Sequence, residues 1–251
     1  MTAALELRGL RKRFGGLTAT DDVNMSVPEG ALHALIGPNG AGKTTLINQV
    51  AGELRHDAGA ILVGGVDVGA LPPWERVRRG LARTFQIAQL LPDDSARDNV
   101  ALAVQARQGH SFRFFADARR NGDGNTQAAQ LLEEVGLSAC AGTRVADLAQ
   151  GERKQLELAV ALATRPSLLL LDEPMAGLSP VESQAMVALL RQLKGKVTIV
   201  LVEHDMDAVF ALADRISVLV YGRVVASGTA DEIRSDPAVR TAYLGEGDEA
   251  C

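Results

Sequence analysis

The stretch from Gly37 to Thr45 has residue types at a spacing that could hold a phosphate group. It reads GPNGAGKTT and fits the pattern G-x-x-x-x-G-K-[ST] in full. Glycines let the backbone turn several N–H groups toward phosphate oxygens. Lys43 can reach the outer phosphates of a nucleotide, and the Thr44 hydroxyl can ligate Mg²⁺. The alternative is a chance glycine-rich turn.

The segments on either side of this loop favour the phosphate site. Leu32–Ile36 is a short apolar run, as expected for a buried strand, and Thr45–Val50 is expected to begin a helix. The positive end of that helix would face the anion.

Two acidic residues, Asp172 and Glu173, end the apolar run that starts at Leu168. A carboxylate at the end of a buried strand is unusual unless charge is needed there. We expect Asp172 to hold the Mg²⁺ water shell beside Thr44. We expect Glu173 to polarise a water that attacks the terminal phosphate. Alternatively, both residues cap the following turn.

Two further polar residues follow predicted strands. His204 comes directly after the buried strand Val197–Val202, at the sheet edge where open α/β sheets bind ligands, and could donate to a phosphate oxygen. Gln86 ends the predicted strand Leu81–Phe85 and could ligate Mg²⁺, contact the water or simply be a surface residue.

The segment LAQGE, from Leu148 to Glu152, precedes a helix predicted for Glu152–Ala163. A glycine at a helix N-terminus can bind an anion, so Gly151 is a further candidate.

The elements that must position these residues alternate between strand and helix. Further strands are predicted at Leu5–Leu7, Val23–Val27, Gly59–Val63, Val66–Val68, Ser167–Leu171, Ile216–Tyr221 and Val224–Ala226. Further helices are predicted at Pro72–Gly80, from Ser179 to about Lys194, at Met206–Ala213, and in the tail near Asp231–Arg234 and Pro237–Leu244.

The middle of the chain has a different character. A helix is predicted at Ser95–Arg107 and another at Thr126–Val135, capped by Thr126 and ended by Gly136. Residues 108–125 are predicted to form a loop or a frayed linker. This loop contains an aromatic cluster, Phe112, Phe114 and Phe115, which is either a local tether or a docking surface.

Composition limits the classes of protein to consider. The 251 residues are 47% hydrophobic, enough for a sizeable core, and the net charge of −5 disfavours a general nucleic-acid or anionic-lipid surface. Cys140 and Cys251 are too far apart in sequence to suggest a disulfide framework or a metal site. With no long apolar run and no secretory segment, we expect a cytoplasmic protein that reaches a membrane through partners.

Taken together and in this order, these motifs resemble the ATP-binding subunits of ABC transporters over nearly the whole chain. The resemblance implies an α/β fold: a P-loop NTPase core with a mainly parallel sheet, an N-terminal antiparallel β subdomain and an inserted helical subdomain. The core would comprise residues 1–86 and 148–251, and the helical subdomain residues 87–147.

The resemblance also implies a site for ATP and Mg²⁺. Nucleotide contacts would come from Phe14, which would stack on adenine or merely pack, and from Gly37, Pro38, Asn39, Gly40, Ala41, Gly42, Lys43, Thr44, Thr45, Gln86, Ala149, Gln150, Gly151 and Glu152. Mg²⁺ would be held by Thr44, Gln86 and Asp172, and the catalytic residues would be Glu173 and His204.

Partners follow from the same resemblance. The loop around Gly151 would bind the ATP of a second ATP-binding subunit, so that two subunits enclose two nucleotides. Integral membrane permeases would dock near Gln86 and residues 87–147, at the inner face of the cell membrane, and a substrate-binding protein would act indirectly. No nucleic-acid partner is expected.

Two departures from the family pattern stand out. The usual LSGGQ is LAQGE here, so Ala149 lacks a hydroxyl, and Ser179 replaces the usual Asp. The contribution to the partner's site is therefore expected to be weaker. This chain's own site is expected to be hydrolytically competent, because it keeps Lys43, Asp172, Glu173 and His204.

Other segments narrow the resemblance. AGLSP from Ala176, EHDMDAVF from Glu203 and AYLG from Ala242 resemble the first of two paralogous ATPases of branched-chain amino acid importers. Urea and lipopolysaccharide transport ATPases are close alternatives. A soluble ABC ATPase acting on ribosomes, a GTPase or kinase, and a catalytically silent scaffold are the other functions considered.

Overall fold

The computed structural model describes residues 3–84, 90–108 and 122–239. Its central sheet has the strand order β10-β9-β3-β8-β7-β6. The strands are β3 (Leu32–Ile36), β6 (Leu81–Arg83), β7 (Leu168–Asp172), β8 (Thr198–Val202), β9 (Arg215–Val220) and β10 (Arg223–Gly228). All neighbours are parallel except β10, which pairs antiparallel with β9.

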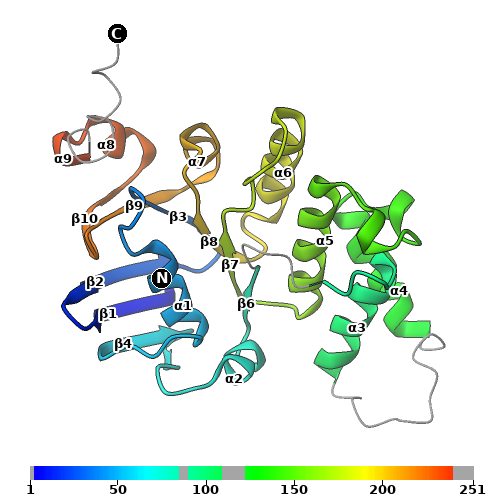
Figure 1. Cartoon of the computed structure of the whole chain (residues 1–251), viewed down its shortest axis with the longest axis horizontal. Helices are drawn as coiled ribbons and strands as arrows, with labels where there is room; N and C mark the ends of the chain where they lie inside the picture. The colour runs from blue at the N-terminus through cyan, green and yellow to red at the C-terminus, as the bar shows by residue number, and fades with distance from the viewer. Residues whose placement is uncertain (1–2, 85–89, 109–121, 240–251) are drawn as a thin grey trace.

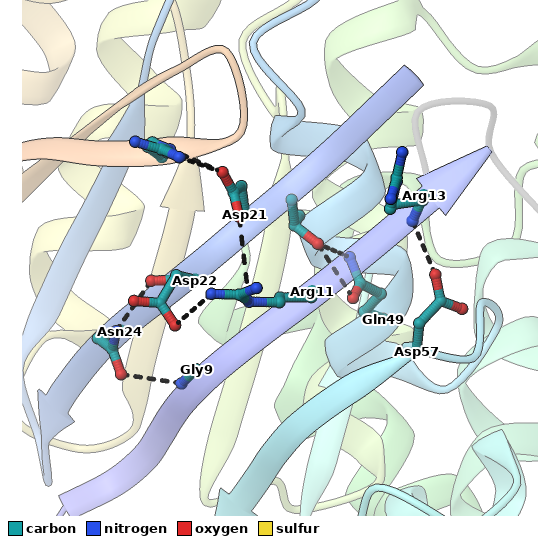
Figure 2. Close-up of polar contacts among 10 residues, drawn as sticks. Gly9, Arg11, Arg13, Asp21, Asp22, Asn24, Gln49 and Asp57 are labelled. Carbon is teal, nitrogen blue, oxygen red and sulfur yellow. Dashed lines mark hydrogen bonds and ion pairs between the residues drawn. The ribbon is translucent and has the colours of Figure 1, made fainter. Parts of the chain in front are cut away.

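A second, antiparallel sheet is built mostly from the N-terminal part of the chain. Its strands are β1 (Ala3–Phe14), β2 (Leu17–Pro28), β4 (Ala58–Val63) and β5 (Val66–Asp67), in the order β2-β1-β4-β5. Hydrogen bonds and ion pairs link its strands to one another and to neighbouring segments (Figure 2). The Gly9 N–H donates to Asn24 Oδ1 at 2.8 Å, and the Arg13 N–H donates to Asp57 Oδ2 at 2.8 Å.

The leucine run of β7 shows how the core is divided. Leu168 and Leu170 pack in a cluster with β1, β2, β4 and helix α1 (Lys43–Ala51), whereas Leu169 and Leu171 pack in a second cluster on the other face. Successive side chains of a strand point to opposite faces, so a strand covered on both faces needs an apolar residue at each position. This explains the unbroken run that the sequence predicts to be a buried strand.

Helices pack around the two sheets. They are α2 (Pro73–Arg78), α3 (Ala96–Gln108), α4 (Gly122–Glu134), α5 (Gln150–Ala163), α6 (Pro180–Leu193), α7 (Met206–Leu212), α8 (Ala230–Ser235) and α9 (Pro237–Val239), with 3₁₀ turns η2 (Ser138–Cys140) and η3 (Val145–Asp147). Figure 1 shows α3, α4 and α5 gathered at one end of the molecule, across the central sheet from β1, β2 and β4. Among helices formed by residues of the three described ranges, none has the length and apolar character that crossing a bilayer requires.

The predicted α/β fold is confirmed, with its mainly parallel sheet, antiparallel subdomain and helical group. The subdomain boundaries at residues 87 and 147 stay a prediction. Helix α5, which follows the second boundary, packs against both α3 and α4.

The prediction for residues 122–125 was wrong. Helix α4 begins at Gly122, so Thr126 lies inside the helix and does not cap it. Glycine and asparagine favour a loop, but Ala128 and Leu132 are fully buried in the cluster that α4 shares with α3 and α5. Tertiary packing of this kind outweighs the local preference of a weak helix start.

His33, on β3, is a buried titratable group. The residue is 1% exposed, its Nε2 lies 2.8 Å from Ser217 Oγ, and its buried Nδ1 has no hydrogen-bond partner among the described residues. Burial, together with the positive charge of Arg215, lowers the pKa of His33 to about 4.

This environment predicts a loss of stability in acid. The unfolded chain protonates His33 below its ordinary pKa of 6.5, while the folded chain resists protonation until about pH 4. Stability is therefore retained above pH 6.5 and falls between pH 6.5 and 4, by about 3 kcal/mol from this group. The free energy of unfolding in urea should be measured at pH 7 and at pH 4. Between these pH values the His33→Gln variant should lose about 3 kcal/mol less stability than the wild type. Equal losses in both proteins would contradict the assignment.

Candidate functional site

The phosphate-binding motif forms the turn between β3 and α1. Gly37 has φ 156° and Gly42 has φ 104°. A Cβ at Gly37 would overlap the Leu219 carbonyl oxygen, and one at Gly42 would overlap the Ala19 carbonyl oxygen. These two glycines are therefore required by close backbone approach as well as by backbone conformation.

Lys43 starts α1 and folds back over the turn. Its Nζ donates to the carbonyl of Gly37 at 2.6 Å and to that of Pro38 at 3.1 Å. Burial lowers the pKa of Lys43, and the nearby negative charges of Glu173 and Asp172 oppose that shift. The ammonium group is thus held within the loop, close enough to both carboxylates to feel their charge.

A hollow of about 580 Å³ opens beside this turn. Its lining combines the phosphate-binding loop, one carboxylate and an apolar side: Phe14, Leu17, Thr18, Ala19, Asn39, Gly40, Ala41, Gly42, Lys43, Thr44, Thr45, Glu173 and Tyr221. The apolar side suits a base, the loop suits phosphates, and the carboxylate suits an attacking water.

Glu173 follows β7 directly and has φ +50°, which is uncommon for a residue with a side chain. Its N–H donates to the Val202 carbonyl at 2.9 Å, so β8 holds the strained conformation. His204, just after β8, places Nδ1 3.6 Å from Glu173 Oε1. Strain of this type, maintained by the surrounding structure, occurs often at functional sites.

Asp172 is held by an arginine that no sequence motif indicates. Arg83, at the end of β6, places Nη2 3.0 Å from Asp172 Oδ2, and the two side chains are 8% and 3% exposed. Burial raises the pKa of Asp172, and Arg83 opposes that effect. Arg83 also donates to Asn48 and Glu53, which ties the carboxylate to the helix that begins at Lys43. The available signal in the sequence was the basic residue Arg83 near the end of one predicted strand and the acidic residue Asp172 at the end of another.

Glu203 is a second site residue for which the sequence motifs indicate no role. It is 1% exposed, its Oε1 accepts from the Met175 N–H at 2.8 Å, and its Oε2 accepts from the His204 N–H at 3.1 Å. Burial raises the pKa of its carboxyl. Glu203 therefore joins the loop after β7 to the histidine after β8.

The loop around Gly151 lies outside the hollow. Helix α5 begins at Gln150, two residues earlier than predicted, and Glu152 Oε2 accepts from the Ala149 N–H at 2.8 Å. The Gly151 N–H donates to Glu182 Oε1 at 3.2 Å, and Glu182 Oε2 accepts from the Ser179 hydroxyl at 2.6 Å. Among the described residues that line the hollow, none belongs to Ala149–Glu152.

The structure therefore brings the phosphate-binding loop and Glu173 to one hollow, with His204 beside Glu173 and Asp172 next to it in the chain. Phe14, at the end of β1, lies in the lining and is 48% exposed. Gln86, the aromatic cluster at residues 112–115 and the segment 242–245 lie outside the described residues.

The family model for ABC transporters matches residues 20–176, and the chain belongs to this family. It is an ATP-binding cassette ATPase.

A second family model and individual relatives indicate a more specific group within this family. A second family model, described as branched-chain amino acid ATP-binding cassette transporter, matches residues 223–249. The chain is 39% identical to the high-affinity branched-chain amino acid transport ATP-binding protein BraF of Pseudomonas aeruginosa, covering 96% of this chain and 98% of that one. It is 38% identical to LivG of Escherichia coli K12, a protein of the same description, with the same coverage.

Solved structures agree with the assignment to the ABC transporter family. The ADP conformation of MJ1267, an ATP-binding cassette of an ABC transporter, superposes with a TM-score of 0.86 at 29% identity, covering 98% of this chain and 100% of that one. A nucleotide-free ATP-binding cassette from an ABC transporter gives 0.85 at 30% identity, covering 97% and 99%.

The Arg83–Asp172 pair predicts a measurable coupling energy. Removing one partner leaves the other charge buried, which is destabilising, whereas removing both is less costly than the sum. In a urea-unfolding cycle of Arg83→Met, Asp172→Asn and the double variant, we expect a coupling of about 1–3 kcal/mol.

The exposed pair Arg144–Asp147, at 2.9 Å with side chains 59% and 53% exposed, is the matched control for this cycle. Solvent screens exposed pairs, so its coupling should be below about 0.5 kcal/mol. Equal coupling in the two pairs would contradict the importance of burial.

Proposed function

We propose that this chain is the ATP-hydrolysing subunit that powers a membrane importer of branched-chain or related amino acids. The observation that carries the choice of solute is the family match over residues 223–249. The percentage identity over the whole chain does not by itself discriminate between solutes. The sulfate/thiosulfate import protein CysA of Mycolicibacterium paratuberculosis is also 38% identical, over 96% of this chain and 64% of that one.

Hydrolysis is assigned to the hollow beside the phosphate-binding loop. The backbone of that loop and Lys43 would bind the phosphates, and Phe14 would contact the base. Glu173 would polarise the attacking water, and His204, 3.6 Å from it, would orient the water and the terminal phosphate. The proposal is supported by the shared lining of loop and carboxylate.

A Mg²⁺ ion fits the donors at this site. Thr44 lines the hollow and offers a hydroxyl, and Asp172 is a buried carboxylate that accepts a hydrogen bond from Arg83 at Oδ2. Gln86 would complete the set. Hydroxyl, carboxylate and amide oxygens are ligands that Mg²⁺ prefers. When bound, the ion would neutralise charge on the phosphates.

The working assembly would contain two ATP-binding subunits, identical or paralogous, and two permeases. Ala149–Glu152 would contact the nucleotide of the second subunit, which agrees with their position away from this chain's own hollow. The permeases would dock near Gln86 and residues 87–147, at the cytoplasmic face of the membrane.

Uptake measurements test the choice of solute. Deleting the gene should abolish energy-dependent uptake of labelled leucine, isoleucine and valine and leave sulfate uptake unchanged, because each solute uses its own permeases. Restoring the wild-type chain should recover uptake. Normal amino-acid uptake in the deletion strain, with sulfate uptake lost, would overturn the proposed solute.

Glu173→Gln tests the hydrolytic role. The amide keeps the size of the side chain but polarises water poorly, so turnover should fall about 10²- to 10⁴-fold while ATP still binds. An ATP-bound dimer should then accumulate, measurable by gel filtration with MgATP. Glu29→Gln, in the exposed turn after β2, is the control and should keep normal turnover. Near-normal turnover of Glu173→Gln would remove this residue from the mechanism.

A further inference from the structure

The hairpin between β9 and β10 has an unfavourable residue at its tip. Val220 pairs with Arg223, which leaves Tyr221 and Gly222 as a two-residue turn. Both have positive φ, 47° and 78°, as in a type I′ turn. Asn, Asp or Gly is preferred at the first position of this turn, and a bulky side chain there is strained.

Packing does not compensate for this strain. Tyr221 is 87% exposed, the highest value among the exposed large hydrophobic residues of the described chain. Neither local conformation nor core burial therefore explains a tyrosine at this position.

Its location provides an explanation. Tyr221 lines the hollow that also contains Phe14, Leu17 and the phosphate-binding loop. Phe14, Leu17 and Tyr221 are the large apolar side chains of the lining. Phe14 ends β1, Leu17 begins β2, and Tyr221 directly follows β9.

The turn is also fixed relative to the phosphate-binding loop. The Gly222 N–H donates to the Ala41 carbonyl at 2.8 Å, within that loop, and the Gly222 carbonyl accepts from the Asp21 N–H at 2.8 Å. Asp21 Oδ2 in turn accepts from Arg223 Nε at 2.8 Å. Tyr221 is thus carried by backbone that is bonded to the phosphate site on one side and to β2 on the other.

We propose that Tyr221 is a contact residue for the nucleobase, forming with Phe14 and Leu17 the apolar wall of the base subsite. This inference rests on the proposed ATP site and extends it. A tyrosine ring gives a large rigid contact with two side-chain torsions, so little conformational entropy is lost when the base stacks on it.

Two substitutions separate base contact from turn geometry. Tyr221→Asn removes the ring and supplies a residue that the turn prefers, so the melting temperature should rise by about 1–3 °C. The same variant should bind ATP about 5- to 100-fold more weakly, because base–ring stacking is lost. Tyr221→Phe keeps the ring and should bind ATP as wild type does. A gain in stability with a loss in affinity is the distinguishing result.

Calorimetric titration with inorganic tripolyphosphate completes the test. It has the phosphates without the base, so Tyr221→Asn should bind it as wild type does. Trp74→Asn, at another exposed aromatic residue that is 64% exposed and on α2, should leave ATP affinity unchanged.

Three outcomes would overturn the inference. Unchanged ATP affinity in Tyr221→Asn would exclude a base contact. Equal losses for ATP and tripolyphosphate would assign the effect to the phosphate-binding loop. A wild-type protein that binds neither compound would overturn the proposed function, and the base subsite with it.

Discussion

The register between β3, β8 and β7 is the constraint on which the rest of the site depends. Leu35 and Asp172 both pair with Val202 in the parallel sheet, so the three strands end at one level. Parallel strands place their carboxyl ends at the same edge of a sheet. Residues that are 130 positions apart in the chain, Lys43 and Glu173, therefore line the same hollow. A shift of one residue would also exchange the two leucine faces of β7 and disrupt both core clusters.

Burial of charge accompanies this arrangement. Asp172 and Glu203 are almost inaccessible, and burial raises the pKa of both carboxyls. An unpaired buried charge is costly, and each of these groups has a specific partner: a guanidinium for Asp172 and two backbone N–H groups for Glu203. The same bonds that lower this cost also fix the loops after β7 and β8.

Much of this arrangement could be predicted from the sequence because it is encoded locally. The run of leucines before Asp172, the glycines around Lys43 and the Ser179–Pro180 helix start each reflect a nearby physical requirement. Arg83 and Glu203 were missed as site residues because their roles depend on partners 89 and 28 residues away, respectively. The start of α4 was missed for a similar reason, since packing against α3 and α5 overrides its glycines.

Glu182 has a consequence for attempts to restore the common family residue at position 179. Its carboxylate already accepts bonds from the Ser179 N–H, the Ser179 hydroxyl and the Gly151 N–H. An aspartate in place of the serine would bring a second negative charge against the first and remove the hydroxyl donor, so like-charge repulsion would replace an attraction. Gly151, Ser179 and Glu182 therefore form one compatible set, and replacing Ser179 alone would disrupt it.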